Sequence, residues 1–411
     1  MCGLAVPRLE QAYLPSYTFN VSVSSAQAYL SATASGMMAL TGVVFAMAFV
    51  MVQFSAIAYS PRLVLWFARD YALFHSLGAF AATFVYALFT LAWIDRGASG
   101  NVPPFSCLLV AVMLILSMLL FARLVQRLTD LQVTNVLQLI GNKGREVIRA
   151  MFRDLNKWPA GGLNYASESA AACHLPPTTQ TVVYSGFPQT VASLNASALV
   201  AQGKRSGSII EMVAAVGDTL LEGNVVLRVR GGNAPLAEKE LMRSIQLASE
   251  RTFEQDPKYP IRLLVDIAIK ALSPAINDPT TAVQALDQIE DLLGRLGRQE
   301  LHPGFVQDSD GMLRLIIRVP TWDNYLTLAF DEIRQFGAGS IQVMRRMRAA
   351  LVALADTTTI PARAEAVQRY LKHLDLFIER SPFDFEDKAM ALQEDRQGLG
   401  LPRPRSESSR S

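Results

Sequence analysis

Long apolar runs dominate the first third of the chain. They occupy residues 34–59, 71–94 and 102–122, and none of them contains Asp, Glu, Lys or Arg. Each run reaches the roughly 20 residues that an α-helix needs to cross a hydrocarbon core of about 30 Å. The pattern therefore predicts three transmembrane helices. The segment 1–33 before them is expected to lie outside the membrane or along its interface.

A different pattern begins at Arg123, where charges of both signs separate the apolar positions. Residues 123–158 repeat their apolar positions with the period of a helix, so an amphipathic stalk that is unbroken as far as Gly141 is expected. Residues 178–232 hold short β-type runs on either side of the turn at 217–218. These runs predict a small β-module.

Residues 235–380 show mostly helical spacing and predict a helical α+β domain. Its first helix is expected over 235–250, and the run 311–319 is expected to form a strand. Ser340 is expected to cap the helix that follows it. Residues 390–411 have too few apolar side chains to pack and are expected to be disordered. The predicted fold class is an α-helical integral membrane region with three transmembrane helices, plus a cytoplasmic α+β region with a small β-module and a helical C-terminal domain.

The charges divide the chain in the same way. The chain carries 38 Lys and Arg against 36 Asp and Glu, a net charge of +2. Basic residues follow the third apolar run closely, and cytoplasmic ends of membrane helices are enriched in Lys and Arg. The expected location is the bacterial inner membrane, in contact with the lipid bilayer, with the C-terminal domain in the cytoplasm. Near-neutral charge argues against nucleic acid as a partner, so the basic spot at Arg345, Arg346 and Arg348 is interpreted as a solvated helix face.

Two polar side chains, Gln53 and Ser55, follow the apolar centre of the first run. An amide within lipid needs a hydrogen-bonding partner, so these residues either bond to a neighbouring helix or line a pore. Small residues on the same helix would let another helix approach closely, which favours a bundle or a homo-oligomer: Ala34, Ser35, Gly36, Ala39, Gly42 and Ala46.

The stretch ALSPAINDPTTA, Ala271–Ala282, separates two predicted helices. Asp278 followed by Pro279 is typical of a helix N-terminus, because the carboxylate accepts from free backbone N–H groups and proline fits the first helical position. Asn277 is not explained by capping. The stretch is either a structural corner, a protein contact, or part of a ligand or metal site rich in oxygen atoms. The ligand-binding candidates are Glu254, Asp256, Asp266, Asn277 and Asp278.

The runs SGFPQTV, VGDTLLEG, RTFEQDP, ALSPAINDPTTA and TWDNYLTLAFDEIRQFGAGS resemble an uncharacterised family of bacterial predicted membrane proteins. The similarity extends from about Leu14 to Ala355. The run VQFSAIAYSPR in the membrane region is also similar to that family. This resemblance implies an inner-membrane protein with a cytoplasmic C-terminal domain, and it implies no activity and no site.

Catalytic chemistry is disfavoured by the motifs that the sequence lacks. It contains no GxSxG, no P-loop, no dinucleotide-binding fingerprint and no Cys/His pair, so no catalytic residue and no metal ligand are assigned and the cofactor is unknown. The expected function is an oligomeric channel- or transporter-like protein with a cytoplasmic gating or assembly domain. The alternative is a membrane-anchored sensor or scaffold that binds a ligand or partner at the ALSPAINDPTTA corner.

Overall fold

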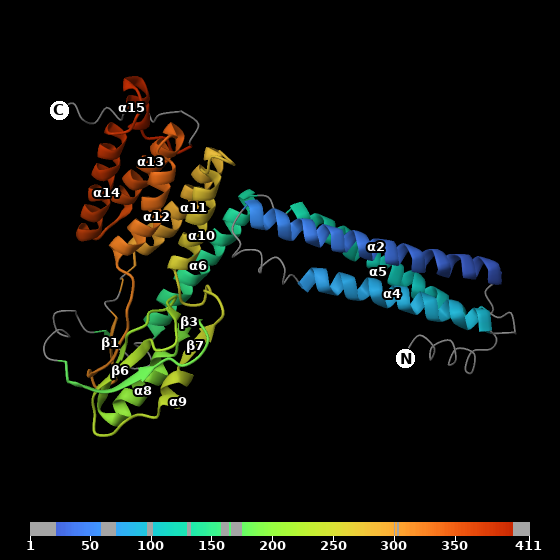
Figure 1. Cartoon of the computed structure of the whole chain (residues 1–411), viewed down its shortest axis with the longest axis horizontal. Coiled ribbons are helices and arrows are strands. Elements are labelled where there is room, and N and C mark those ends of the chain that lie inside the picture. The colour runs from blue at the N-terminus through green and yellow to red at the C-terminus, as the bar shows by residue number, and fades with distance from the viewer. Residues whose placement is uncertain are drawn as a thin grey trace. The chain divides into compact units, whose positions relative to one another are not determined.

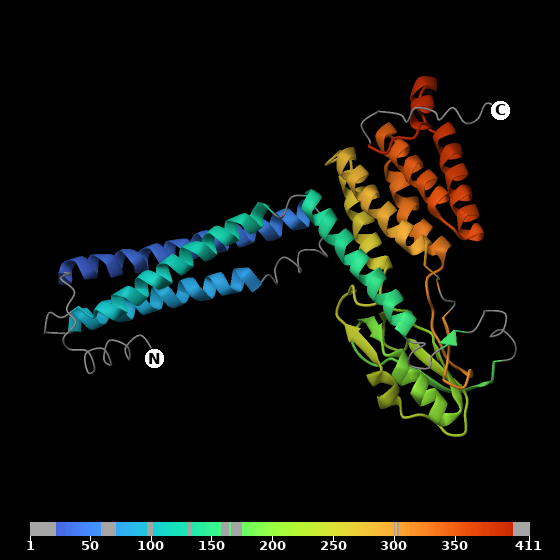
Figure 2. The same ribbon diagram turned by 180° about the vertical axis from the view of Figure 1, so that it is seen from behind.

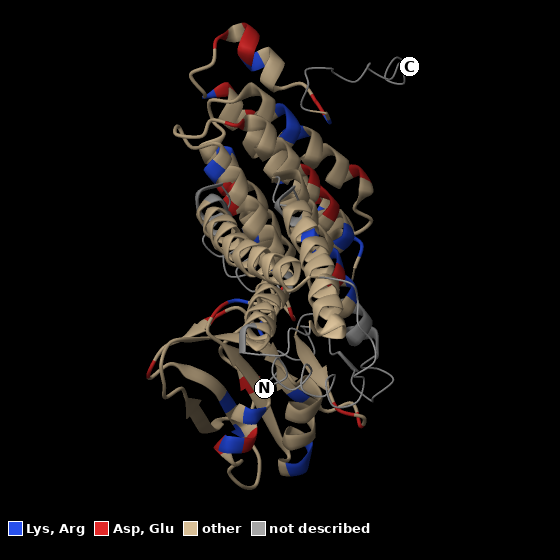
Figure 3. Cartoon of the chain, turned by 90° about the vertical axis from the view of Figure 1, so that its right-hand side faces the viewer, with Lys and Arg blue, Asp and Glu red and all other residues tan. Residues whose placement is uncertain are grey.

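The computed structural model describes residues 22–58, 71–96, 102–129, 133–157, 164–165, 175–299, 301 and 304–397. The chain divides into two compact units, Met1–Val136 and Leu137–Ser411. The described part of the first unit consists of long apolar helices. The second unit holds strands and further helices, and charged residues occur on its strands as well as on its helices (Figure 3).

The three long helices of the first unit pack along one another (Figure 1). Leu30 of the first helix is buried in one cluster with Ala87 and Val110 of the other two. Thr83 and Ser117 share a buried hydrogen bond of 3.1 Å between the second and third helices. All three helices are long and apolar enough to cross a membrane, as predicted. Their bounds are α2, Val23–Ala58; α4, Tyr71–Arg96; and α5, Pro104–Thr129.

The first helix begins earlier than the sequence predicted. Residues 23–33 were expected to belong to a separate segment, but they form the start of α2. Ala26 and Leu30 are buried in the cluster that joins the three helices, so this stretch gains apolar contacts as a helix. Residues 1–21 of the predicted segment lie outside the described residues.

Helix α6, Val133–Lys157, covers the later part of the predicted stalk. It continues through Gly141, where the sequence predicted an end. A Cβ added at Gly141 would lie 2.1 Å from Oε1 of Gln288, so this glycine allows α6 to approach helix α11, Pro279–Gly297. Residues 130–132 lie outside the described range, and the continuity of the stalk across them stays a prediction.

Two sheets form the strand-rich part of the second unit. The larger sheet has the order β1-β8-β9-β4-β6-β2, and the smaller has the order β5-β3-β7. The pairing of β4 with β9 is parallel, with Ile210 opposite Leu315, and the other pairings are antiparallel. Leu199, Val226 and Leu315 are fully buried in the core of this part. The bounds are β1, Asn164–Tyr165; β2, Thr178–Val183; β3, Gln189–Leu194; α8, Ala196–Ser206; β4, Ser208–Met212; β5, Thr219–Leu220; β6, Val225–Gly231; α9, Glu238–Arg243; β7, Ile245–Ala248; β8, Phe305–Gln307; and β9, Leu313–Ile316.

This β-module extends beyond its predicted range of 178–232. Strands β8 and β9 join the sheet from much later in the chain, and β9 lies within the predicted strand 311–319. The predicted helix over 235–250 is wrong in its second half. Only α9 is helical there, and β7 pairs with β3 instead. Strand pairing in the folded protein overrides the helix-like spacing of this stretch.

A group of helices completes the second unit (Figures 1 and 2). Ser340 caps α13 as predicted, because its side chain accepts from the backbone N–H of Val343. Residues 390–397 lie within the predicted disordered tail but belong to the folded part: α15 extends to Ala391, and Asp395 is only 1% exposed. The bounds are α10, Lys258–Ala271; α11, Pro279–Gly297; α12, Trp322–Phe336; α13, Ile341–Thr357; α14, Pro361–Glu379; and α15, Phe385–Ala391.

Candidate functional site

A cavity of about 370 Å³ lies where the strands of the second unit meet its helices, and we name it the junction cavity. Its walls come from segments that are far apart in the sequence. They include the start of α8, the loop 215–218 after β4, the loop 254–258 before α10 and the segment 317–320 after β9, together with Ala150 and Met151 of α6. A concave site built from several segments of a rigid fold is the usual form of a ligand pocket.

The loop RTFEQDP, Arg251–Pro257, holds two of these walls together. Asp256 is 2% exposed and accepts a hydrogen bond from Nε of Arg251. Its other carboxylate oxygen accepts from the backbone N–H of Lys258 at 3.1 Å, at the start of α10. Gln255 bonds to both backbone groups of Leu194, at 3.0 and 3.3 Å. The loop therefore fastens the end of β3 to the beginning of α10.

The Val-Gly-Asp turn at 216–218 forms the wall next to this loop. Gly217 has φ of 89°, in the left-handed region that glycine adopts without steric cost. A Cβ at this position would lie 2.6 Å from Oδ2 of Asp256. Oδ2 of Asp218 accepts from the backbone N–H of Ala215 at 2.9 Å and closes the turn. The glycine thus lets the turn pack directly on the Arg251–Asp256 pair.

The start of α12 supplies the third polar wall. Thr321 and Asn324 form a reciprocal capping box, with bonds of 3.3 Å from the N–H of Asn324 and 3.0 Å from the N–H of Thr321. Tyr325 is 1% exposed. Burial raises the pKa of its hydroxyl, and the negative charge of Asp256 raises it further. Tyr325 therefore lines the cavity as a neutral phenol.

The lining combines apolar side chains with charges of both signs. Asp218 and Asp256 already accept the hydrogen bonds described above. Lys258 and Arg318 line the same cavity, and neither the ammonium group of Lys258 nor the guanidinium group of Arg318 forms an ion pair with a carboxylate of the described residues. Nη1 of Arg318 makes a bond of 3.4 Å to the backbone oxygen of Val213. Four charged side chains of the lining thus form no ion pair with a described residue: the cations of Lys258 and Arg318, and the carboxylates of Asp218 and the exposed Glu254.

The predicted ligand residues do not converge as a set. Glu254 and Asp256 line the junction cavity, whereas Asp266, Asn277 and Asp278 are not among its lining residues. Asp266 accepts from Nε of Arg262 at 2.7 Å on α10. Within the described part of the chain, no group of three His, Cys, Asp or Glu side chains is placed to hold a metal ion.

The ALSPAINDPTTA corner has a structural explanation. Asp278 caps α11 by accepting from the N–H and the hydroxyl of Thr281, at 3.1 and 2.6 Å, and Pro279 occupies the first helical position as predicted. Asn277 is exposed and has φ of 50°, a conformation that asparagine tolerates better than most residues. Its backbone conformation accounts for the residue that capping left unexplained. A ligand role for Asn277 stays a prediction.

The predicted pore residues lie on α2. The side chain of Gln53 is exposed in the first unit. Ser55 belongs to the helix, but its side chain lies outside the described residues.

Sequence reasoning missed most of the junction cavity. The blocks VGD, RTFEQDP and TWDNY were all visible as motifs, but nothing local in the sequence indicates that they share one cavity. Contacts between segments of high sequence separation bring them together. A search for clustered acidic residues could find only Glu254 and Asp256.

Three helices apolar enough to cross a membrane, followed by a unit of strands and further helices, are typical of a membrane protein. Residues 2–353 match the family described as "Predicted membrane protein (DUF2254)", and the chain belongs to this family. It is 26% identical over 385 residues to the uncharacterized protein Rv1290c of Mycobacterium tuberculosis, and equally to Mb1321c of Mycobacterium bovis, covering 91% of this chain and 72% of each relative. No solved structure matches. The resemblance predicted from the sequence blocks is thereby confirmed.

Proposed function

We propose that the protein is a membrane-anchored sensor or scaffold that binds a small amphiphilic molecule in the junction cavity. The observation that carries the proposal is a cavity of about 370 Å³ whose lining combines apolar walls with a few charged groups. This volume lies at the lower end of the roughly 300–1,000 Å³ that ligand pockets occupy. The alternative predicted from the sequence is retained, with its site moved from the ALSPAINDPTTA corner to this cavity.

We infer a ligand with an apolar body and one anionic end, which would lie beside the two cations of the lining and away from Asp218 and Glu254. Leu194, Val216 and Ile317 offer apolar surface, while Lys258 and Arg318 offer positive charge without a carboxylate partner among the described residues. Burying an apolar body contributes about 25 cal/mol per Å² removed from water. The cations would then fix the orientation of the anionic end.

Helix α6 could couple ligand binding to the membrane region, because it contacts the cavity and follows the last membrane helix in the sequence. Met151 of α6 lines the cavity, and α6 is the next helix along the sequence after the membrane helix α5. A ligand that contacts Met151 restrains the segment that leads back to the membrane helices. This coupling is the sensing step of the proposed function.

Octanoate, a small apolar carboxylate, is a suitable probe for the cavity. Native mass spectrometry of the full-length protein should show one octanoate retained by the wild type and none by Ala215→Trp, whose indole would fill the space. Ala362→Trp places the same side chain on an exposed position of α14 and should retain octanoate. Absence of retention by the wild type, or equal retention by Ala215→Trp, would reject the cavity as the binding site.

A channel-like oligomer is the second candidate, and Gln53 is the observation in its favour. Gln53 lies one helical turn after Phe49 and Val50, which are 64% and 61% exposed. An amide on such an apolar face gains a hydrogen-bonding partner if a second copy or a water-filled path covers it. Ion conductance of the protein in liposomes should change on Gln53→Leu. Electrically silent bilayers from folded protein would argue against conduction.

The orientation in the membrane rests on the distribution of basic residues. Arg123 and Arg127 follow the third apolar span, and an excess of Lys and Arg marks cytoplasmic ends. The second unit is accordingly proposed to lie on the cytoplasmic side of the bacterial inner membrane. Alkaline phosphatase fused after Ser411 should be inactive, since the enzyme needs the periplasm to form its disulfides. An active fusion would reverse the orientation.

A further inference from the structure

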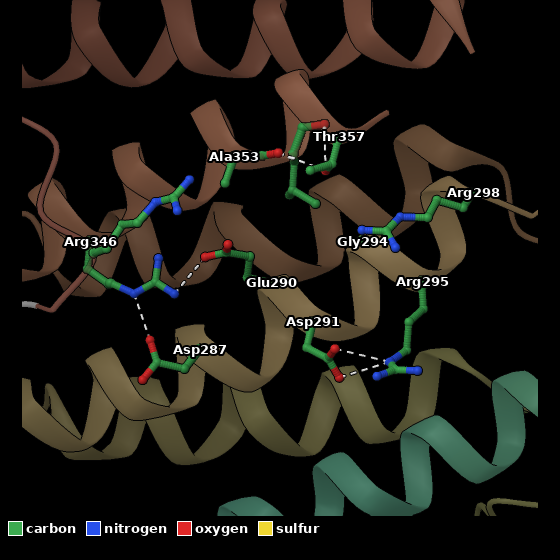
Figure 4. A pocket seen from close by; sticks show the side chains of 11 residues that line it. Asp287, Glu290, Asp291, Gly294, Arg295, Arg298, Arg346, Ala353 and Thr357 are labelled. Carbon is green, nitrogen blue, oxygen red and sulfur yellow. Dashed lines mark hydrogen bonds and ion pairs between the residues drawn. The ribbon is translucent and has the colours of Figure 1, made fainter. Parts of the chain in front are cut away.

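Four arginines line a groove of about 620 Å³ between helices α11 and α13, which we name the arginine groove (Figure 4). This groove shares no lining residue with the junction cavity. Its α11 wall consists of residues spaced three or four apart, which therefore lie on one face of the helix. The arginines are Arg295 and Arg298 on α11, Arg346 on α13, and Arg396 in the segment after α15.

Arg346 is buried within this groove and is only partly satisfied. It is 4% exposed, so the interpretation of this part of α13 as a solvated helix face is wrong. Its Nε donates to Asp287 at 2.7 Å and its Nη2 donates to Glu290 at 2.6 Å (Figure 4). Its Nη1 is buried without a hydrogen-bond partner. An unsatisfied buried donor costs about 1–3 kcal/mol, and more when it is charged.

The carboxylates of the groove are already paired. Asp287 and Glu290 accept from Arg346. Asp291 accepts from Nη1 of Arg145 at 2.7 Å and from Nε of Arg295 at 3.0 Å. All three carboxylates of the lining thus have a cationic partner.

Two cations of the groove remain without a carboxylate. Arg298 and Arg396 are exposed, and no acidic side chain of the described residues forms an ion pair with either. The guanidinium groups without a carboxylate are therefore those of Arg298 and Arg396, and Nη1 of Arg346 adds a buried donor without a partner. All of them favour an acceptor that is negatively charged.

Arg396 follows Asp395, whose carboxylate lies 3.7 Å from Nη2 of Arg345, so its backbone lies near the Arg346 end of the groove. We propose that the arginine groove binds a phosphate-type oxyanion, held at this end by Arg346 and Arg396. The planar guanidinium group matches the geometry of phosphate oxygens and can donate two parallel hydrogen bonds. Because Nη1 of Arg346 is buried, binding requires the side chains that cover it to move. The anion then supplies the acceptor that the buried donor lacks.

The length of the groove favours a chain of phosphates over a single one. Arg298 lies three turns of α11 beyond Asp287, about 16 Å along the helix axis at 1.5 Å per residue. A single phosphate bound beside Arg346 cannot also contact Arg298. A linear polyphosphate can reach from one end toward the other, so it should bind more tightly than inorganic phosphate.

Isothermal titration of the full-length protein in an uncharged detergent tests this site, with inorganic phosphate and tripolyphosphate as probes. Arg396→Gln should weaken the binding of both probes at least tenfold. Arg298→Gln should weaken tripolyphosphate binding by a similar factor and leave phosphate binding unchanged. Arg346→Lys keeps the positive charge but loses the planar guanidinium group, so it should also weaken the binding of both phosphate and tripolyphosphate.

Arg380→Gln removes an exposed arginine at the end of α14 and serves as the matched control. It should bind both probes as the wild type does. Because Arg298 and Arg396 are exposed, their substitutions should leave the melting temperature unchanged, so a loss of binding reports on the site. Absence of binding by the wild type, or equal weakening by Arg380→Gln, would overturn the proposal. Neither result would bear on the junction cavity, which octanoate probes separately.

Discussion

Gly217 combines a backbone requirement with a packing requirement, and Gly223 allows the two to be separated. Both have positive φ, 89° and 83°, but an added Cβ would meet Asp256 Oδ2 at 2.6 Å at Gly217 and nothing within 4 Å at Gly223. Gly223→Ala should lower the free energy of unfolding by about 1–2 kcal/mol through backbone strain alone. Gly217→Ala should cost more, because the Arg251–Asp256 pair must also move.

Urea unfolding followed by far-UV circular dichroism measures both losses on the same scale. If both variants lose the same free energy of unfolding, the close contact between Gly217 and Asp256 does not limit the size of the side chain at position 217. The sequence revealed the Val-Gly-Asp turn, since such turns have a local signature. It could not reveal the neighbouring carboxylate, because Gly217 and Asp256 meet only through tertiary structure.

Asp308 makes the stability of the β-module depend on pH. It is 1% exposed and accepts from Arg314 Nε at 2.7 Å and from the backbone N–H groups of Asp310 and Met312. Burial alone would raise the pKa of Asp308, but these hydrogen bonds lower it below the ordinary value of 3.8. A depressed folded-state pKa stabilises the protein above the unfolded value, and this contribution is lost as pH falls through the folded-state pKa.

Asp308→Asn should therefore be less stable than the wild type by about 1–3 kcal/mol at pH 7. The gap should begin to narrow below about pH 4, where this carboxylate takes up its proton in the unfolded chain, and should close as pH falls through the lower folded-state pKa. Urea unfolding at pH 7 and pH 3 measures the gap, and Asp356→Asn, at an exposed carboxylate on α13, provides the control. A gap that stays constant across this range would show that the charge of Asp308 contributes nothing.

Helix α11 begins where the sequence predicted, because the signal at its N-terminus is local. Asp278→Ala removes the acceptor for the Thr281 N–H and hydroxyl and should destabilise the protein by about 1 kcal/mol, measured by urea unfolding. Asp278→Asn should retain most of the stability, because asparagine caps about as well as aspartate. An asparagine variant as unstable as the alanine variant would assign the effect to charge.

Elements whose partners are distant in the sequence were predicted less well. Ser340 caps α13 as expected, since a cap depends on residues three positions away. The stretch around β7 was predicted as a helix, yet Ile245 pairs with Leu194, about fifty residues earlier. Asn277 was predicted only in part. Its position in a turn was evident from the neighbouring prolines, but its positive φ was not.

The larger sheet combines strands that lie far apart in the sequence, and this pairing determines which fragments of the second unit can fold alone. Strand β9 follows α10 and α11 in the chain but pairs in parallel with β4, where Ile210 lies opposite Leu315. A fragment of residues 175–250 retains β4 but lacks β8 and β9, so it exposes an unpaired edge and opens the core around Ile210. We expect this fragment to be unfolded or aggregated, whereas residues 137–411 should unfold cooperatively in urea. A cooperative transition in the short fragment would show that the range predicted from the sequence, 178–232, is close to an autonomous module. The parallel pair would then be an accessory to that module, and the junction cavity would form between two independently stable parts.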